Sequence, residues 1–390
     1  MNTPKIRFKG FTDDWEQRKL GEIVLRESLA RESTIDLPYV EYEDVIAEEG
    51  RINKDIRKKE GIKKGIFFDG SQVLYGKLRP YLHNWLNPDF SGVAVGDWWV
   101  LKPNNVDKNF IYRLIQTQQF DDIANQSTGS KMPRADWNLV SNTEFAIPTS
   151  QVEQTKIGGY FSTLDNLITL HQRKCDETKE LKKYMLQKMF PKDGEKNPEI
   201  RFEGFTDDWE QRKFSDLYVK VSEKNDLSFG ADKIISVANM YFKQDIKESG
   251  DDYMKTYNVM RLGDIAFEGN KSKNYAHGRF VENTIGDGIV SHVFDVFRPI
   301  VDYDLSYWKY FINNEGIMGR IMARCTKSST MMTNLVANDF LKEFVLVPAL
   351  AEQKEIGEYF RNLDNLITLH QRKCEKLKEL KKFMLQNMFV

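Results

Sequence analysis

The chain contains one sequence pattern twice, and this repeat constrains its fold more than any other feature. Residues 6–19 (IRFKGFTDDWEQRK) and 200–213 (IRFEGFTDDWEQRK) are identical at thirteen of fourteen positions. Residues 159–190 and 358–389 match at 24 of 32 positions, and both contain LDNLITLHQRKC without a change. Each half of the chain is therefore one unit, made of a short opening motif, a variable globular domain and a long amphipathic segment.

The two variable domains share a frame of apolar runs. In the first and second copies these runs are VLYG and IAFEG (73–76, 265–269), WWVLKP and FDVFRP (98–103, 294–299), and FAIP and FVLVP (145–148, 344–348). The apolar runs are kept while the polar residues between them change, so the same frame carries different loops. We interpret Trp98 and Trp99 as core residues.

The long segments at the end of each half have the spacing of helices. Residues that are mostly apolar or nearly so step by three or four from Ile157 to Met189, and again from Ile356 to Met388. This spacing is typical of a coiled coil, whose narrow seam needs a partner helix. If residues 151–189 are all helical, the rod is ~58 Å long. The alternative is a helix buried in an ordinary globular core.

Two histidines and two cysteines fall in these seams. His171 and Cys175 and their copies His370 and Cys374 sit at seam positions, so we interpret them as packing residues rather than ligands.

Two near-identical units in one chain pack most simply about a pseudo-two-fold axis. Such an axis, perpendicular to the helix pair, makes the helices antiparallel and puts the variable domains at opposite ends. This arrangement suits a target with two separated parts, and duplex DNA repeats its half-sites every ~34–36 Å.

Composition excludes several classes of protein. The 390 residues are 41% hydrophobic and 29% charged, which indicates a globular chain rather than a disordered one. Lys and Arg number 57 against 58 Asp and Glu, so the chain is not basic overall, although local basic loops are allowed. Its three cysteines argue against a disulfide scaffold. Without an apolar leader or a long apolar run, we expect a cytoplasmic protein with no membrane partner.

Four loops carry the polar residues of a candidate nucleic-acid surface. They span 72–86 and 125–137 in the first domain, and 268–280 and 323–334 in the second. Lys and Arg neutralise phosphate, Arg pairs with guanine, Asn pairs with adenine, and small residues allow close approach. The candidate DNA-binding residues are Lys77, Arg79, Tyr81, His83, Thr128, Ser130, Lys131, Arg134, Lys271, Lys273, Asn274, Tyr275, His277, Arg279, Lys327, Ser328 and Ser329. The alternative is that the basic residues only keep exposed strand edges soluble.

No motif of catalysis is present in the sequence. It has no GxxxxGK[ST] loop and no GxGxxG after a strand. The nearest string to an adenine methyltransferase motif is Asn87-Pro88-Asp89-Phe90, which lacks the second proline and is interpreted as a turn. No Cys/His spacing fits zinc. We therefore expect no active site, metal or cofactor in this chain.

The whole chain resembles the specificity (S) subunit of type I restriction-modification systems. The resemblance rests on the doubled opening motif, VLYGKLRPYL at 73–82, TGSKMPR at 128–134, and the junctions IPTSQVEQTKI (147–157) and VPALAEQKEI (347–356) before LDNLITLHQRKC. Each motif is weak alone, but together and in this doubled order they are highly specific. In the second domain NKSKNYAHGRF replaces KLRPYL, so its half-site should differ from the first.

The resemblance implies a fold and a set of partners. The fold is α+β: two mixed α/β target-recognition domains, separated by two long antiparallel helices that form a coiled coil, with a pseudo-two-fold internal repeat. We expect recognition domains at 1–150 and 199–349, spacer helices at 151–190 and 350–390, and a linker at 191–198. The family implies that each domain reads one half of a bipartite DNA site and that the helices set the spacing.

The same resemblance places the chemistry in other subunits. The helices are expected to dock two methyltransferase (M) subunits, and two restriction (R) subunits join the complex. S-adenosylmethionine, and ATP with Mg, belong to those partners, and this chain has no catalysis of its own. Two alternatives stay open: a reading subunit of a related system with a fused methyltransferase-nuclease partner, and a structural coiled-coil adaptor with no nucleic acid partner.

Overall fold

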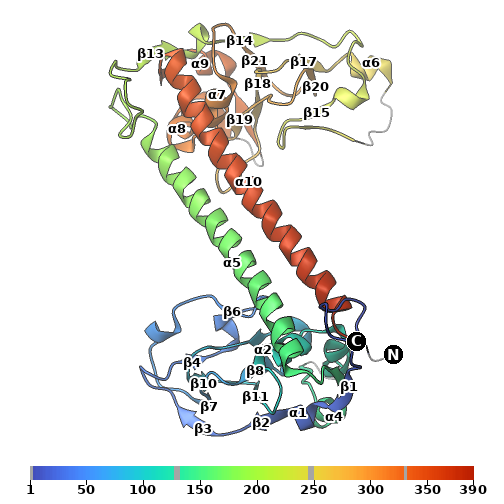
Figure 1. The fold of residues 1–390 in the computed structure, drawn as a ribbon. Helices are drawn as coiled ribbons and strands as arrows, with labels where there is room; N and C mark the ends of the chain where they lie inside the picture. Colours follow the sequence, from blue (N-terminus) through green and yellow to red (C-terminus); the bar gives the residue numbers. More distant parts are fainter. Residues whose placement is uncertain (1–2, 127–131, 245–249, 329–331) are drawn as a thin grey trace. The chain divides into compact units, whose positions relative to one another are not determined.

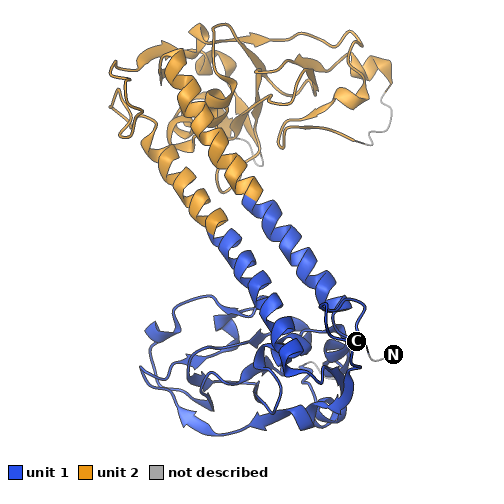
Figure 2. Cartoon of the chain, in the orientation of Figure 1, with its two compact units in different colours: residues 1–173, 370–390 blue, residues 174–369 orange. Residues whose placement is uncertain are grey.

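The computed structural model describes residues 3–126, 132–244, 250–328 and 332–390 (Figure 1). Contacts between residues divide the chain into two compact units (Figure 2). The first unit is Met1–Arg173 with His370–Val390, and the second is Lys174–Leu369. Each unit therefore contains one globular part together with a stretch of both long helices.

Both expected long helices are present. Helix α5 spans Gln151–Lys188 and helix α10 spans Leu350–Asn387, with 38 residues each. None of the helices in the described ranges combines the length and apolar character that crossing a membrane requires.

The two helices run antiparallel in each unit. In the first unit, the Phe161 ring lies 6.2 Å from Phe389 and the His171 ring lies 5.2 Å from His370, so residue numbers rise on one helix as they fall on the other. In the second unit, Phe190 of the segment after α5 lies 6.1 Å from Phe360, while the Cys175 sulfur is 4.0 Å from the Ile367 carbonyl. The predicted antiparallel pair is confirmed.

The seam of the helix pair is formed by the residues that the spacing predicted. Buried and half-buried side chains recur along both helices at three- and four-residue steps, which is how a stripe forms on one helix face, and the fully buried ones lie on both sides of a half-buried stretch. These residues are Ile157, Phe161, Leu164 and Cys175 on α5, and Ile356, Phe360, Leu363 and Cys374 on α10. The interpretation of the two cysteines as seam residues is confirmed.

The first globular part contains two four-stranded sheets among its described residues. Their strand orders are β2-β11-β8-β9 and β3-β7-β10-β4, and the pairs β1-β12 and β5-β6 complete the strands. The strands are β1 (Glu16–Lys19), β2 (Val24–Glu27), β3 (Ala30–Glu32), β4 (Tyr39–Val40), β5 (Val45–Ile46), β6 (Arg51–Ile52), β7 (Lys64–Phe68), β8 (Val73–Gly76), β9 (Trp85–Leu86), β10 (Gly92–Ala94), β11 (Trp98–Pro103) and β12 (Glu144–Ile147). The helices are α1 (Leu20–Ile23), α2 (Lys108–Leu114), α3 (Gln118–Ala124), α4 (Trp137–Asn142) and the 3₁₀ turns η1 (Tyr42–Asp44), η2 (Ile56–Lys58) and η3 (Pro80–Leu82).

The second globular part has a four-stranded sheet with the order β14-β21-β18-β19, which repeats the β2-β11-β8-β9 sheet of the first part. Pairs β13-β24, β15-β16, β17-β20 and β22-β23 surround it in the described ranges. Its strands are β13 (Glu210–Lys213), β14 (Tyr218–Val221), β15 (Ile235–Ser236), β16 (Tyr241–Phe242), β17 (Asn258–Met260), β18 (Ile265–Glu268), β19 (Arg279–Glu282), β20 (Gly288–Val290), β21 (Val296–Pro299), β22 (Thr326–Ser328), β23 (Thr333–Leu335) and β24 (Phe344–Val347). Its helices are α6 (Asp251–Met254), α7 (Leu305–Ile312), α8 (Glu315–Cys325), α9 (Ala337–Phe340), η4 (Phe214–Asp216) and η5 (Ala231–Lys233).

The apolar runs shared by the two copies are equivalent strands. VLYG and IAFEG form β8 and β18, which pair with β11 and β21, the strands formed by WWVLKP and FDVFRP. FAIP and FVLVP form β12 and β24, and each pairs antiparallel with the EQRK strand of an opening motif. A common frame that carries different loops is therefore confirmed.

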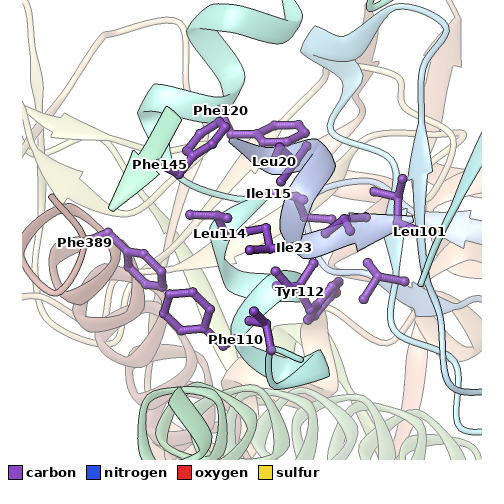
Figure 3. Packing of buried hydrophobic residues seen from close by; sticks show 14 of the residues in the cluster. Leu20, Ile23, Leu101, Phe110, Tyr112, Leu114, Ile115, Phe120, Phe145 and Phe389 are labelled. Carbon is purple, nitrogen blue, oxygen red and sulfur yellow. The ribbon is translucent and has the colours of Figure 1, made fainter. Parts of the chain in front are cut away.

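Aromatic and aliphatic side chains together fill the core of the first unit (Figure 3). Phe389, from the segment after α10, stacks on Phe110 of α2 with ring centroids 5.3 Å apart, and both meet Trp15 edge to face. The buried rings of Trp98 and Trp99 confirm their interpretation as core residues. The end of α10 thus packs into the first globular part and not only against α5.

The opening motif is held to the first turn of a long helix in both copies. Arg7 Nε donates to Glu153 Oε1 at 2.6 Å, and Arg201 Nε donates to Glu352 Oε1 at 2.7 Å. Both glutamates are 1% exposed. Bonding to the glutamate raises the pKa of each arginine. The repeated motif therefore encodes a repeated buried ion pair.

Candidate nucleic-acid interface

The two candidate loops of the first domain lie against each other. Leu78 and Arg134 form an isolated antiparallel bridge. The Arg79 amide donates to the Pro133 carbonyl at 2.7 Å, and the Ala135 amide donates to the Lys77 carbonyl at 2.8 Å. Loops that are about fifty residues apart in the chain therefore form one surface.

A carboxylate of the same domain orders part of this surface. Asp97, just before β11, accepts from Arg134 Nη2 at 3.0 Å and lies 3.4 Å from Lys77 Nζ. The bonded Arg134 guanidinium, with further help from Lys77, holds the pKa of Asp97 below its ordinary value. Two of the predicted cations are thus oriented by an anion, and their charge is partly compensated.

The turn between β8 and β9 carries the half-buried Arg79 and the exposed Tyr81. The 3₁₀ turn η3 lies between Arg79 and His83, which have φ values of 50° and 52°. Non-glycine residues rarely adopt this left-handed region, and strain of this kind tends to be kept where function requires it. The Tyr81 side chain is 52% exposed. Arg79 Nε is buried without an acceptor in the described part of the chain.

His83 is bonded to protein groups through both ring nitrogens. Its Nε2 lies 2.9 Å from Asp121 Oδ1, its Nδ1 lies 3.4 Å from Glu48 Oε1, and its ring stacks on Trp85. These residues also line a cavity of about 520 Å³ beside α5 and α10 in the first unit. The His83 ring is therefore engaged by protein groups, whereas the Tyr81 side chain is exposed. Thr128, Ser130 and Lys131 lie outside the described residues.

The second domain brings its two candidate loops together in the same way. Asn270 and Met332 form an isolated antiparallel bridge, as Leu78 and Arg134 do in the first domain. The Thr333 amide donates to the Gly269 carbonyl at 2.8 Å, and its hydroxyl donates to the His277 carbonyl at 3.0 Å. The predicted loop pairs are thus neighbours in both copies.

The candidate residues of the second domain differ in exposure. Lys271, Lys273, Asn274, Lys327 and Ser328 are exposed, whereas Tyr275, His277 and Arg279 are half-buried. Ser329 lies outside the described residues.

Arg279 is the most constrained of these candidates. Its Nε donates to Glu268 Oε2 at 2.8 Å, and its Nη2 donates to the Ala238 carbonyl at 2.6 Å. Its guanidinium lies 5.1 Å from the centre of the Tyr275 ring. A carboxylate therefore orients a cation in this domain too.

Sequence reasoning missed the groups that hold these loops in place. Asp97 and Glu268 orient cations, and the Tyr42 hydroxyl accepts from the Leu78 amide at 3.1 Å. Glu268 directly precedes Gly269 at the end of a predicted run, so only its position could have drawn attention to it. Across the described ranges, no three His, Cys, Asp or Glu side chains are placed to hold a metal ion.

Comparisons with known proteins agree in the kind of protein that they find. A family model described as the type I restriction modification DNA specificity domain matches the chain twice, at residues 12–180 and 206–379. The chain is 23% identical over 301 residues to the type I restriction enzyme MjaVIII specificity subunit of Methanocaldococcus jannaschii, covering 71% of this chain and 68% of that protein.

Solved structures show the same fold. The S subunit of a type I restriction-modification system from M. genitalium matches with a TM-score of 0.60 at 13% identity, over 100% of this chain and 99% of that one. A chain from a study of complex assembly and conformational transition of the type I R-M system matches with a TM-score of 0.53 at 16% identity, over 95% and 96% of the two chains.

Proposed function

Because this chain belongs to the family of type I restriction-modification specificity subunits, we propose that each variable domain reads one half of a bipartite site in duplex DNA. One observation supports this most directly. The bridge Leu78–Arg134 and the bridge Asn270–Met332 join equivalent loop pairs on equivalent frames, yet the side chains on the two pairs differ. One frame with two different polar surfaces suits two different half-sites.

Side chains of these loops have the chemistry that base and phosphate contacts require. In the first domain the half-buried Arg79 precedes a strained turn that contains the exposed Tyr81, and Lys271, Lys273 and Asn274 are exposed in the second domain. Arg reads guanine and Asn reads adenine through paired hydrogen bonds, while Lys neutralises phosphate. We therefore take the loops at 72–86, 125–137, 268–280 and 323–334 as the DNA-reading surface.

We further propose that the helices set the distance between the half-sites. Each contains 38 residues, which corresponds to a rod of ~57 Å. On this proposal the recognition domains are residues 1–150 and 199–349, and the linker at 191–198 joins the first spacer helix to the second domain. DNA and the M and R subunits are the partners that membership of the family implies.

An exposed apolar set on the helices supports the docking of M subunits. The first unit exposes Leu167, Leu380 and Phe383, and the copies of these residues in the second unit are Leu366, Leu181 and Tyr184. Residues three apart on a helix share a face, as Leu380 and Phe383 do, so each set suits a partner helix. One set in each unit supports two M subunits per chain.

The chemistry of the complex is assigned to those partners. S-adenosylmethionine would be bound by the M subunits, and ATP with Mg by the R subunits, while this chain selects the site. Family membership supports a non-catalytic role for the chain.

Mapping methylated adenines tests the proposal. Genomes from cells with the chain and its M subunit are compared with genomes from cells that lack the chain. We expect methylation at a bipartite motif with a fixed spacer, only where the chain is present. Replacing residues 20–150 with those of a relative should then change one half of the motif. A continuous motif, or a change in both halves, would contradict the proposal.

The same experiment separates the two alternatives. A structural adaptor would leave the methylation pattern unchanged when the chain is removed. A fused methyltransferase-nuclease partner would keep the bipartite motif, and the open reading frames next to this gene would identify it.

A further inference from the structure

Resting on the proposed function, we propose that Asp165 and Asp364 are positioning residues that fix the angle between each recognition domain and the long helices of its own unit. Each carboxylate bonds to a residue of the recognition domain and to a lysine of the other long helix. The two sites are copies of each other within the repeat.

The first site joins three helices of the first unit. Asp165 lies on α5, and its Oδ2 accepts from Arg113 Nη1 of α2 at 2.7 Å. Its Oδ1 lies 2.8 Å from Lys381 Nζ of α10. The side chains of Arg113 and Lys381 are only 1% and 13% exposed. Burial lowers the pKa of Lys381.

The second site repeats this geometry with the helices exchanged. Asp364 lies on α10, and its Oδ2 accepts from the Tyr310 hydroxyl of α7 at 2.6 Å. Its Oδ1 accepts from Lys182 Nζ of α5 at 2.6 Å. Burial, and then the bond to Asp364, raise the pKa of Tyr310.

The repeat explains why both sites exist. Asp364 and Lys381 are the copies of Asp165 and Lys182, 199 residues further along the chain. The domain residues occupy equivalent positions, because Arg113 of α2 and Tyr310 of α7 each lie six residues after a capping aspartate, Asp107 or Asp304. Their residue types differ. An arginine and a tyrosine share little except the ability to donate a hydrogen bond at this place.

A bond of this kind opposes rotation of the domain on its helices. Hydrogen bonds to a charged group are short and directional. Rotating α2 or α7 away would leave the buried Arg113 or Tyr310 without its carboxylate acceptor, which is costly, while the aspartate would keep only its lysine. On the proposed function, this rotation would move a reading surface along the DNA axis. The length of spacer that the protein accepts would then change.

The sharpest variant is Tyr310→Phe, because it removes one hydroxyl and keeps the ring. The test uses the full chain in complex with its M subunits, on duplexes that carry the two mapped half-sites. The spacer is kept at its native length or made one base pair shorter or longer. We expect the preference for the native spacer to fall about two- to tenfold, the factor that corresponds to one hydrogen bond of ordinary strength. The bases read in each half should not change.

A matched control is Tyr241→Phe, because Tyr241 is 51% exposed on β16 of the same unit. It should keep the spacer preference of the parent chain. Asp165→Asn tests the first site in the same assay, and Lys381→Met replaces it if Asp165→Asn does not fold.

The outcomes separate the inference from the function on which it rests. If Tyr310→Phe slows methylation equally at all three spacers, or leaves all three rates unchanged, the positioning role is overturned and the proposed function stands. If the unmodified complex shows no preference for any spacer, the proposed function itself fails. Thermal unfolding of each variant shows whether a rate change reflects loss of folded protein.

Discussion

The imidazoles of His171 and His370 face each other across the two long helices, with 3.0 Å between their Nδ1 atoms. The two residues are copies in the repeat, so the chain pairs a residue with its own duplicate. At this distance one ring must donate and the other accept. The interpretation of both as seam residues is confirmed, and the seam is polar at this point.

This pairing predicts a non-additive effect of substitution. His171→Leu or His370→Leu alone leaves one half-buried ring nitrogen without its partner, so each should lower the free energy of unfolding by about 1–3 kcal/mol. The double variant completes an apolar seam and should lose less than the sum of the two. Chemical denaturation of all four chains measures the coupling. Strictly additive losses would show that the rings do not interact.

The buried ion pairs of the opening motifs predict matched losses of stability. Glu153→Gln should weaken the first unit and Glu352→Gln the second, each by about 3 kcal/mol, because one charge of a buried pair is removed. Calorimetry of the intact chain measures both transitions. Glu22→Gln is the control, since the Glu22 and Arg18 side chains are exposed and 3.6 Å apart, and it should change stability by less than about 1 kcal/mol.

Glu282 predicts a dependence of stability on pH. Burial raises its pKa well above the ordinary value, and both of its carboxyl oxygens are buried without a hydrogen-bond partner in the described ranges. A raised pKa in the folded state means that the protonated form stabilises the fold below the unfolded pKa of about 4.3. This stability is lost as the pH rises through the folded pKa.

The second unit should therefore be less stable at pH 8 than at pH 5. Glu282→Gln keeps the shape of the neutral acid, so it should raise the free energy of unfolding at pH 8 by about 1–3 kcal/mol and flatten the pH profile. Thermal melts at three pH values measure this. The exposed Glu203→Gln is the control, and an unchanged profile in Glu282→Gln would contradict the prediction.

We predict that Arg79→Ala changes base recognition at one half-site. If Arg79 reads a base edge, the substitution should cost about 1–3 kcal/mol of binding and relax specificity in the first half-site alone. Binding to a panel of DNA sites, each with one base changed, measures this. Arg57→Ala, at an exposed position outside the candidate loops, should leave the base preference intact. Equal weakening on every sequence would make Arg79 a phosphate contact.

The duplicated apolar set predicts the number of M subunits. Leu380→Ser with Phe383→Ser should remove one M subunit, and Leu181→Ser with Tyr184→Ser should remove the other. Native mass spectrometry of the complex counts the subunits. Val152→Ser is the control, because Val152 is 62% exposed on α5 but its copy is Ala351. Loss of both M subunits from either pair of substitutions would show that the two sets are not independent.

The repeat and the helices could be predicted from the sequence because their signals are local or periodic. A seam that steps by three and four residues predicts a helix and its buried face together. The apolar runs at 73–76 and 265–269 likewise predicted a shared frame, since equivalent buried elements keep their apolar residues while the loops between them change.

The arrangement of the candidate site depended on contacts between distant residues. Asp97 orients Arg134, 37 residues away, and Asp165 accepts from Arg113, 52 residues away. No periodicity marks an aspartate as the partner of a particular cation, because that choice is made where folded elements meet. His83 illustrates the same limit. It lies in a loop whose composition suits DNA reading, but its ring is bonded to Asp121 of α3.

The sequence by itself therefore determined the duplicated plan of this protein, its long helices and the loops that differ between the copies, because repeats and apolar periodicity are written along the chain. Only the tertiary structure decided which polar groups meet. Arg113 and Tyr310 take the same role at Asp165 and Asp364 although an arginine and a tyrosine have little chemistry in common, because hydrogen-bonding geometry in the folded state determines which side chains pair.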